Sequence, residues 1–286
     1  MTGSDLLSSV PAIDPETSEL YLSRLELNRR NRLVHQEIAD SQAFHRRLLD
    51  AFPRLDGEQA DAARAAHGIL YRLDARRGEA GAVIALVQSV TAPDWSVLPP
   101  GYLHDEGWDA WAGGAEVAVK PTADRYRALQ AGDAFRFRLR ANPTRKIHIK
   151  PGTKGRNGQL LPVTRANGKR EPLPFETLDE RLRRQRGEAD SERKTTMWWL
   201  QQKAAQHGFQ VLDASDQPDP VGGKEQVGWK GMRPDRQRLT HAAVLFEGVL
   251  RITDADRFRA TLWQGIGSGK AYGFGLLSIA PIARRG

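Results

Sequence analysis

The sequence predicts an α+β protein built from two tandem ferredoxin-like (RRM-like) domains, with antiparallel sheets and a basic cleft. Three observations lead to this fold class. The first half reads strand, helix, strand, strand, helix, strand, the element order of a ferredoxin-like domain. The second half repeats much of that order without visible sequence repetition. The chain also carries 43 Lys and Arg against 35 Asp and Glu, an excess that favours polyanionic partners, nucleic acid first.

Composition restricts the remaining classes of protein. A chain of 286 residues can bury one large core or two smaller ones, and 40% hydrophobic content excludes wholesale disorder. The absence of cysteine excludes disulfides, thiolate metal sites and cysteine nucleophiles. The first residues lack a secretory signal, and no run approaches the ~20 apolar residues of a membrane span. We therefore expect a cytoplasmic protein without a membrane partner.

The first domain is expected over residues 20–142, after a loose leader at 1–19. Strand 21–27 alternates apolar and polar residues, and Asp40 or Ser41 can cap a following helix that runs to about Ala51. The other elements expected in this domain are strands 69–73 and 82–90, a short helix 123–130, and strand 134–141 as its last strand.

The second domain is expected over residues 143–286, because Pro143 marks a plausible boundary. Residues 146–170 are basic and rich in Gly and Pro, which is typical of a hairpin or a mobile insertion. The elements expected after them are helical sequence within 174–207, strands 208–212 and 239–252, a helix 254–264, and an apolar strand 274–279.

Five glycines lie within eleven residues before that last strand: Gly265, Gly267, Gly269, Gly273 and Gly275. Glycine takes positive φ easily and lets another backbone or a phosphate approach closely. The loop is not a P-loop, because Ala271 follows its lysine, and Lys270 breaks the dinucleotide-binding pattern. Both of those motifs also run from strand to helix, whereas this loop runs from helix to strand. From the residues alone, a flexible helix-to-strand connection is the favoured explanation.

Four stretches in the same order resemble the RAMP superfamily and, within it, the CasE endoribonucleases. They are the glycine-rich GIGSGKAYGFGLLSIAP at 265–281, YLSRL at 21–25, FRLRANP at 137–143 and VLFEGVL at 244–250. The resemblance implies two ferredoxin-like domains. It also implies cleavage of CRISPR repeat RNA at the 3′ side of its hairpin. The product would stay bound, and the protein would join Cascade, touching its backbone subunit first.

Histidine is the residue type best suited to such a reaction. No two of the seven histidines show metal-ligand spacing, so we predict no metal site and no cofactor. Cleavage then needs the RNA's 2′-hydroxyl as nucleophile, with a base, an acid and positive charge around the phosphorane. From the residues alone, His45 on its helix reads as a surface histidine. The resemblance implies that it is catalytic, with Arg46 beside it.

Gln42 departs from the family pattern, because relatives often carry tyrosine three residues before this histidine. Glutamine can orient a phosphate oxygen but cannot transfer a proton. His45 would then act with Arg46, with His35 or with a lysine, or cleavage would be slow. A non-catalytic subunit that binds the RNA hairpin is therefore an alternative, and a scaffold with incidental basic charge is a third.

Basic residues predict where RNA binds. Residues 135–140 alternate so that three arginines share one strand face at ~7 Å spacing, where they repel unless an anion lies across them. A solvated outer face is nearly as good an explanation. By resemblance, the basic residues that follow enter the groove of the hairpin, and Lys270 meets phosphate. The predicted RNA-binding residues are Arg136, Arg138, Arg140, Arg145, Lys146, Lys150, Lys154, Arg156, Arg165 and Lys270.

Overall fold

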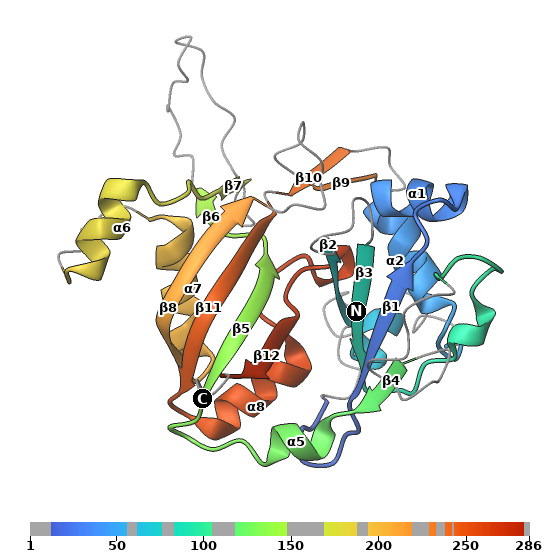
Figure 1. The fold of residues 1–286 in the computed structure, drawn as a ribbon, viewed down its shortest axis with the longest axis horizontal. Helices are drawn as coiled ribbons and strands as arrows, with labels where there is room; N and C mark the ends of the chain where they lie inside the picture. Colours follow the sequence, from blue (N-terminus) through green and yellow to red (C-terminus); the bar gives the residue numbers. More distant parts are fainter. Residues whose placement is uncertain are drawn as a thin grey trace, which may run out of the picture.

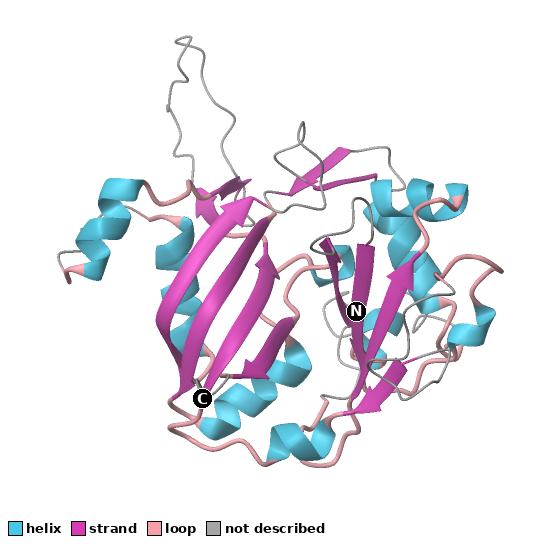
Figure 2. Ribbon diagram, viewed as in Figure 1, coloured by secondary structure: helices cyan, strands magenta, loops and turns pink. Residues whose placement is uncertain are grey.

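Two four-stranded antiparallel sheets stand side by side, each with helices packed on one face (Figure 1 and Figure 2). The structure is a computed structural model that describes residues 13–55, 62–75, 83–104, 118–147, 169–187, 194–218, 229–232, 238–241 and 243–282. No helix within these ranges is long and apolar enough to cross a membrane.

The first sheet has the strand order β2-β3-β1-β4. Its strands are β1 (Tyr21–Leu27), β2 (Leu70–Ala75), β3 (Val83–Ser89) and β4 (Ala118–Pro121). Every neighbouring pair is antiparallel, so in order of appearance the strands lie 4-1-3-2, the ferredoxin-like arrangement. Between β1 and β2 the chain forms α1 (Arg32–Ala39), α2 (Ser41–Leu49) and α3 (Ala63–Ala66).

Capping residues set where α1 and α2 begin. The Asn31 side chain accepts a hydrogen bond from the Leu33 backbone N–H, and Asp40 accepts one from Gln42 in the same way. Asp40 is one of the two caps that the sequence predicted for α2, whereas α1 was not among the expected elements. Phe44 and Leu48 on α2 are buried against β1, β2 and β3, in the core of the first domain.

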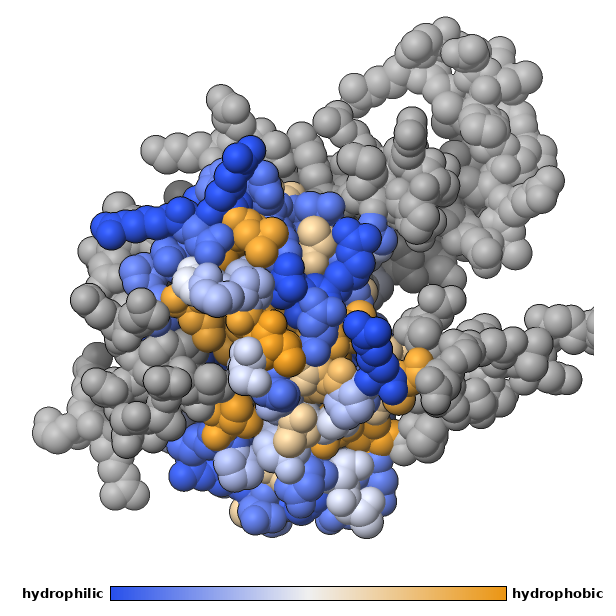
Figure 3. Space-filling view, turned by 90° about the vertical axis from the view of Figure 1, so that its right-hand side faces the viewer, coloured by the Kyte–Doolittle hydropathy of each residue, from blue (hydrophilic) through white to orange (hydrophobic). Residues whose placement is uncertain are grey.

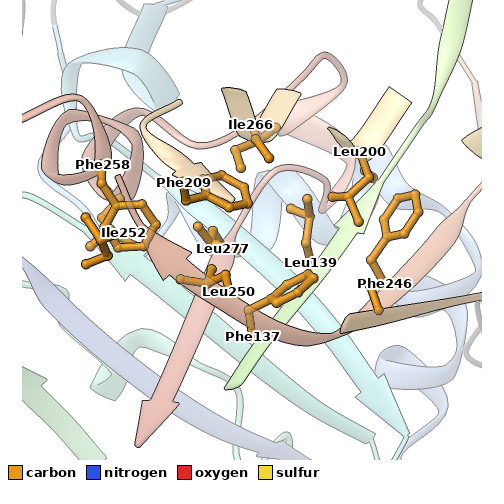
Figure 4. Packing of buried hydrophobic residues seen from close by; sticks show 14 of the residues in the cluster. Phe137, Leu139, Leu200, Phe209, Phe246, Leu250, Ile252, Phe258, Ile266 and Leu277 are labelled. Atoms are coloured by element: carbon orange, nitrogen blue, oxygen red, sulfur yellow. The ribbon is translucent and has the colours of Figure 1, made fainter. Parts of the chain in front are cut away.

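The second sheet has the strand order β12-β5-β11-β8, again 4-1-3-2 in order of appearance. Its strands are β5 (Ala134–Ala141), β8 (Phe209–Pro218), β11 (Val244–Ile252) and β12 (Leu277–Pro281). The helices α7 (Thr196–Gln206) and α8 (Ala255–Gln264) cover one face. Their apolar side chains and those of the strands form the core shown in Figure 4.

The assignment of strand 134–141 to the first domain is wrong. β5 pairs with β11 and β12 in the middle of the second sheet, and Phe137 and Leu139 are buried in its core. The fourth strand of the first sheet is instead the short β4, and α5 (Ala123–Arg127) connects the two sheets. By sheet membership the division between domains falls between Pro121 and Ala134, rather than after residue 142.

Several shorter elements complete the described chain. β6 (Thr144–Ile147) pairs with β7 (Lys169–Pro172), so the predicted hairpin is confirmed at its base, and β9 (Trp229–Met232) pairs with β10 (Arg238–His241). The helix α6 (Leu178–Gln185) starts with a capping box. The short 3-10 turns are η2 (Trp95–Val97) and η4 (Lys270–Tyr272).

Part of the expected loose leader is anchored. The Arg127 guanidinium donates to the Pro15 and Ser18 carbonyl oxygens at 3.0 and 2.7 Å. Ile13 packs against the core of the second domain. Residues 13–19 therefore brace the connection between the sheets, and the expectation of a loose leader is wrong for them; residues 1–12 lie outside the described residues.

The outer surface of the first domain is mainly hydrophilic. Figure 3 shows the face on the right of Figure 1, where blue hydrophilic residues surround separate groups of apolar ones. The candidate functional residues lie instead around the glycine-rich loop, between the two sheets.

Candidate functional site

The glycine-rich loop joins α8 to β12 and touches both domains. All five of its glycines have positive φ, as their sequence suggested: Gly265, Gly267, Gly269, Gly273 and Gly275. At Gly273 a Cβ atom would lie 2.8 Å from the Tyr71 ring and 2.9 Å from Arg140 Nη1. At this glycine, therefore, side chains of the protein approach the loop closely, as the sequence had suggested for a phosphate or another backbone.

Phe274 fixes the loop to the first domain. Its side chain is fully buried in the core that β1, β2, β3 and α2 form, although it comes from the C-terminal end of the chain. The Arg140 guanidinium lies over this ring, 4.6 Å from its centroid, and donates to the Tyr272 and Gly273 carbonyl oxygens at 3.4 and 3.2 Å.

The prediction that Arg140 binds RNA is wrong. The residue is fully buried, so RNA has no access to it. Its side chain is turned toward the glycine-rich loop, where it packs on Phe274 and donates to loop carbonyl oxygens. Arg140 instead holds the loop in place.

His45 lies on α2, beside the loop. Its imidazole stacks on Tyr71 with 6.4 Å between ring centroids, and the Tyr71 hydroxyl donates to the Ala271 carbonyl oxygen at 3.1 Å. Burial, together with the nearby Arg64, lowers the pKa of His45 from 6.5 to about 4. Its buried Nδ1 has no hydrogen-bond partner among the described residues. At neutral pH this imidazole is uncharged and can accept a proton.

Two cations accompany His45. Arg64 on α3 and Lys270 in η4 interact electrostatically, and the pKa of Lys270 falls because of burial and the charge of Arg64. The Arg64 guanidinium donates to the Ile69 carbonyl oxygen at 3.3 Å. Within the described ranges, no carboxylate forms an ion pair with either cation. The site therefore combines a neutral base with positive charge that no carboxylate of the described residues neutralises.

A groove of about 680 Å³ extends from Lys270 along α7 to the base of the β6–β7 hairpin. Among the described residues, its lining contains no carboxylate. The residues that line it are Asn142, Thr144, Arg145, Lys194, Trp198, Trp199, Gln202, Lys203, Gln206, His207, Gln264, Gly265, Gly267, Ser268 and Lys270. Cations and amides with an aromatic floor suit a phosphate backbone, and we call this surface the basic groove.

A second cleft, of about 740 Å³, lies on the opposite face of the second sheet and carries charges of both signs. Arg138 there pairs with Glu247 and, at 3.5 Å, with Asp74 of β2. The mutual repulsion of the arginines on this strand face requires nearby anions. At Arg138 those anions are carboxylates of the protein itself. An RNA-binding role for Arg138 is not supported. Arg136 is exposed in the same cleft.

The other predicted residues are spread around the site. Gln42 lies one turn before His45 on α2, and Arg46 is exposed. Arg145 is exposed on β6 and pairs with Glu171 at 3.0 Å. The backbone of Lys146 pairs within the hairpin base, whereas Lys150, Lys154, Arg156 and Arg165 lie outside the described residues. Their roles remain predictions.

Sequence reasoning missed Arg64, Tyr71 and two lysines of the basic groove, Lys194 and Lys203. Lys203 lies on α7 three residues after the buried Leu200. The spacing of Trp199, Lys203 and Gln206 places them along one helix side, a pattern that could have indicated a surface groove. Arg64 and Tyr71 carry no local signal, because their neighbours in the site come from α2 and η4.

Fold and site together define a tandem ferredoxin-like protein with a basic groove that reaches the glycine-rich loop and a neutral histidine on the helix beside that loop. The chain belongs to the CRISPR-associated protein family, whose sequence profile matches residues 20–281.

Named relatives agree with this membership. The chain is 31% identical over 266 residues to the CRISPR-associated endoribonuclease Cse3 of Thermus thermophilus, covering 92% of this chain and all of the relative. It is also 31% identical over 156 residues to the CRISPR system Cascade subunit CasE of Escherichia coli, covering 54% of this chain and 61% of the relative.

Solved structures agree as well. Thermus thermophilus Cse3 bound to an RNA representing a pre-cleavage complex has a TM-score of 0.60 at 30% identity, covering 92% of this chain and all of that one. Cas6e of Escherichia coli shares the fold, with a TM-score of 0.53 at 23% identity, 92% coverage of this chain and 100% of that one.

Proposed function

We propose that this protein is a cytoplasmic endoribonuclease that cleaves CRISPR repeat RNA at the 3′ side of its hairpin. The observation that carries the proposal is the neutral His45 imidazole beside the glycine-rich loop, together with a groove at Lys270 whose described lining has cations and no carboxylate. The similarity to an endoribonuclease, and to its structure with bound RNA, supports the same activity.

In the proposed reaction, His45 takes the proton of the 2′-hydroxyl as general base. The 2′-oxygen then forms a bond to phosphorus while the bond from phosphorus to the 5′-oxygen breaks. The leaving 5′-oxygen takes a proton from water, and His45 returns its own proton to the solvent. The products are a 2′,3′-cyclic phosphate and a 5′-hydroxyl. Lys270 offsets the charge of the phosphorane.

The basic groove would hold the RNA backbone. Lys194, Lys203 and Arg145 border it, and the β6–β7 hairpin continues from its far end. Each phosphate contact releases counterions, so Lys203→Gln should weaken RNA binding and make the slope of log affinity against log salt shallower by about 0.7–0.9. Similarity to the Cascade subunit CasE supports retention of the product in Cascade, with the backbone subunit as first partner.

End-labelled cognate repeat RNA, incubated with the protein in excess EDTA, tests the activity. We expect cleavage of this RNA, none of an RNA with a single 2′-deoxy substitution at the cut site, and a cyclic phosphate on the product. His45→Ala should abolish cleavage and keep hairpin affinity within about three-fold, because the groove supplies most binding. Cleavage by this variant at the wild-type rate would refute the assignment of His45.

Gln42 keeps a second function open, that of a subunit that binds the hairpin without cutting it. The residue lies at the helical spacing where it faces the same side of α2 as His45, and its amide transfers no proton. Tight binding of the repeat hairpin, with no cleavage of either RNA over hours, would establish this alternative instead.

A further inference from the structure

Arg64 is a cation without an assigned role, and it lies next to the proposed reaction centre. It precedes β2 on the four-residue helix α3 and is half-buried. Half-buried arginines in proteins are usually paired with a carboxylate, because an unpaired charge loses solvation. In the described chain, the hydrogen bond of Arg64 to the Ile69 carbonyl oxygen leaves its positive charge unneutralised.

Contacts near Arg64 bring together β2, α2 and η4. Ile69, which anchors Arg64, lies two residues before Tyr71 in β2. Tyr71 stacks on His45 of α2, and its hydroxyl binds Ala271, the neighbour of Lys270 in η4. The charge of Arg64 reaches both His45 and Lys270, while burial lowers its own pKa.

We propose that the Arg64 guanidinium binds a non-bridging oxygen of the scissile phosphate and stabilises the phosphorane together with Lys270. The proposal rests on the proposed function. Two cations close together and without carboxylates repel each other, and an anion placed between them removes that repulsion. A guanidinium is also planar and matches two phosphate oxygens at once, which an ammonium group does not.

The charge of Arg64 has a second effect in this position, because it opposes protonation of His45. The ionisable groups at this imidazole in the described chain are Arg64 on α3 and Tyr71 on β2, and Lys270 in η4 interacts with Arg64 in turn. The same cation would thus bind the substrate and keep the base uncharged.

Single-turnover cleavage of the repeat RNA by Arg64→Gln and Arg64→Lys tests the proposal. We expect Arg64→Gln to slow cleavage about 100-fold at pH 7, the effect of removing one preorganised donor to a reacting oxygen. Affinity for the uncleavable 2′-deoxy RNA should change less than about three-fold, because many groove contacts remain. Arg64→Lys should recover part of the rate. Arg251→Gln, at an exposed arginine of β11, is the matched charge control.

A phosphorothioate at the cut site separates contact from structural support. Sulfur in place of the contacted oxygen should slow the wild-type protein and have little further effect on Arg64→Gln. Exogenous guanidinium should also partly restore cleavage by Arg64→Ala.

Two results overturn the proposal: cleavage by Arg64→Gln within three-fold of wild type, or an unchanged phosphorothioate effect in a variant that is slow and folded. If the wild-type protein itself does not cleave, the proposed function fails first, and the two failures are thereby distinguished.

Discussion

The Tyr71 hydroxyl donates a hydrogen bond to the Ala271 carbonyl oxygen at 3.1 Å, across 200 positions of sequence. Tyr71 is a fully buried core residue of the first domain, and Ala271 belongs to the glycine-rich loop of the second. The same ring stacks on His45. One tyrosine therefore sets the position of the proposed base relative to the loop that carries Lys270.

Tyr71→Phe should lower the free energy of unfolding by about 0.5–1.5 kcal/mol, the usual contribution of one hydrogen bond. It should also slow cleavage, because the loop loses a tether next to Lys270. Urea unfolding and single-turnover cleavage measure the two effects. Tyr21→Phe, at a half-buried tyrosine of β1, is the matched control. Equal stability of the two variants would contradict the tether.

Gly273→Ala should destabilise the protein far more than Gly132→Ala. Both glycines have positive φ, +77° and +97°, so each alanine costs about 1–2 kcal/mol of backbone strain. Only at Gly273 would the new Cβ meet other atoms within 3 Å, at Tyr71 and Arg140, while Gly132 has nothing within 4 Å. Overpacking should add about 1–3 kcal/mol, measured by urea unfolding. Similar losses in both variants would show that the loop adapts.

The stability of the protein should fall as the pH drops from 6.5 toward about 4. His45 has a pKa of about 4 when folded and 6.5 as a model value, so in this window the unfolded chain binds more protons than the folded one. Above pH 6.5 the effect vanishes. His45→Gln should make this decline shallower but not remove it, because burial also lowers the pKa of His207.

Urea unfolding at pH 7 and pH 5 measures this slope, and His35→Gln, at an exposed histidine of α1, is the control. An unchanged pH dependence in His45→Gln would mean that this imidazole takes up its proton as easily in the folded protein as in the unfolded chain.

Arg138→Glu should act on folding and not on RNA recognition. The substitution would place a third carboxylate beside Asp74 and Glu247, which Arg138 now bridges between the domains. The loss of charged hydrogen bonds alone costs about 1.5–3 kcal/mol, which thermal unfolding detects. Arg136→Glu, two residues earlier and exposed, should cost much less. Loss of RNA affinity by folded Arg138→Glu, without loss of stability, would return Arg138 to the binding surface.

Local patterns in the sequence determined much of this protein. The period-two alternation of 135–140 identified a strand with bounds close to those of β5, and Asp40 identified the start of α2. The positive φ of all five loop glycines follows from residue type, because these conformations cost little without a Cβ. Four short stretches in order were enough to indicate the family, which the comparisons confirm.

Only the tertiary structure decided which sheet β5 joins and which arginines are available to bind RNA. Strand pairing and burial depend on partners more than a hundred positions away, such as Glu247 for Arg138 and Tyr272 for Arg140. The alternating pattern marks two faces of a strand but does not say which face meets another domain. Arg138 and Arg140 thus looked like an RNA surface in the sequence, while Arg64, unremarkable there, lies beside the proposed base because three separate elements converge on it.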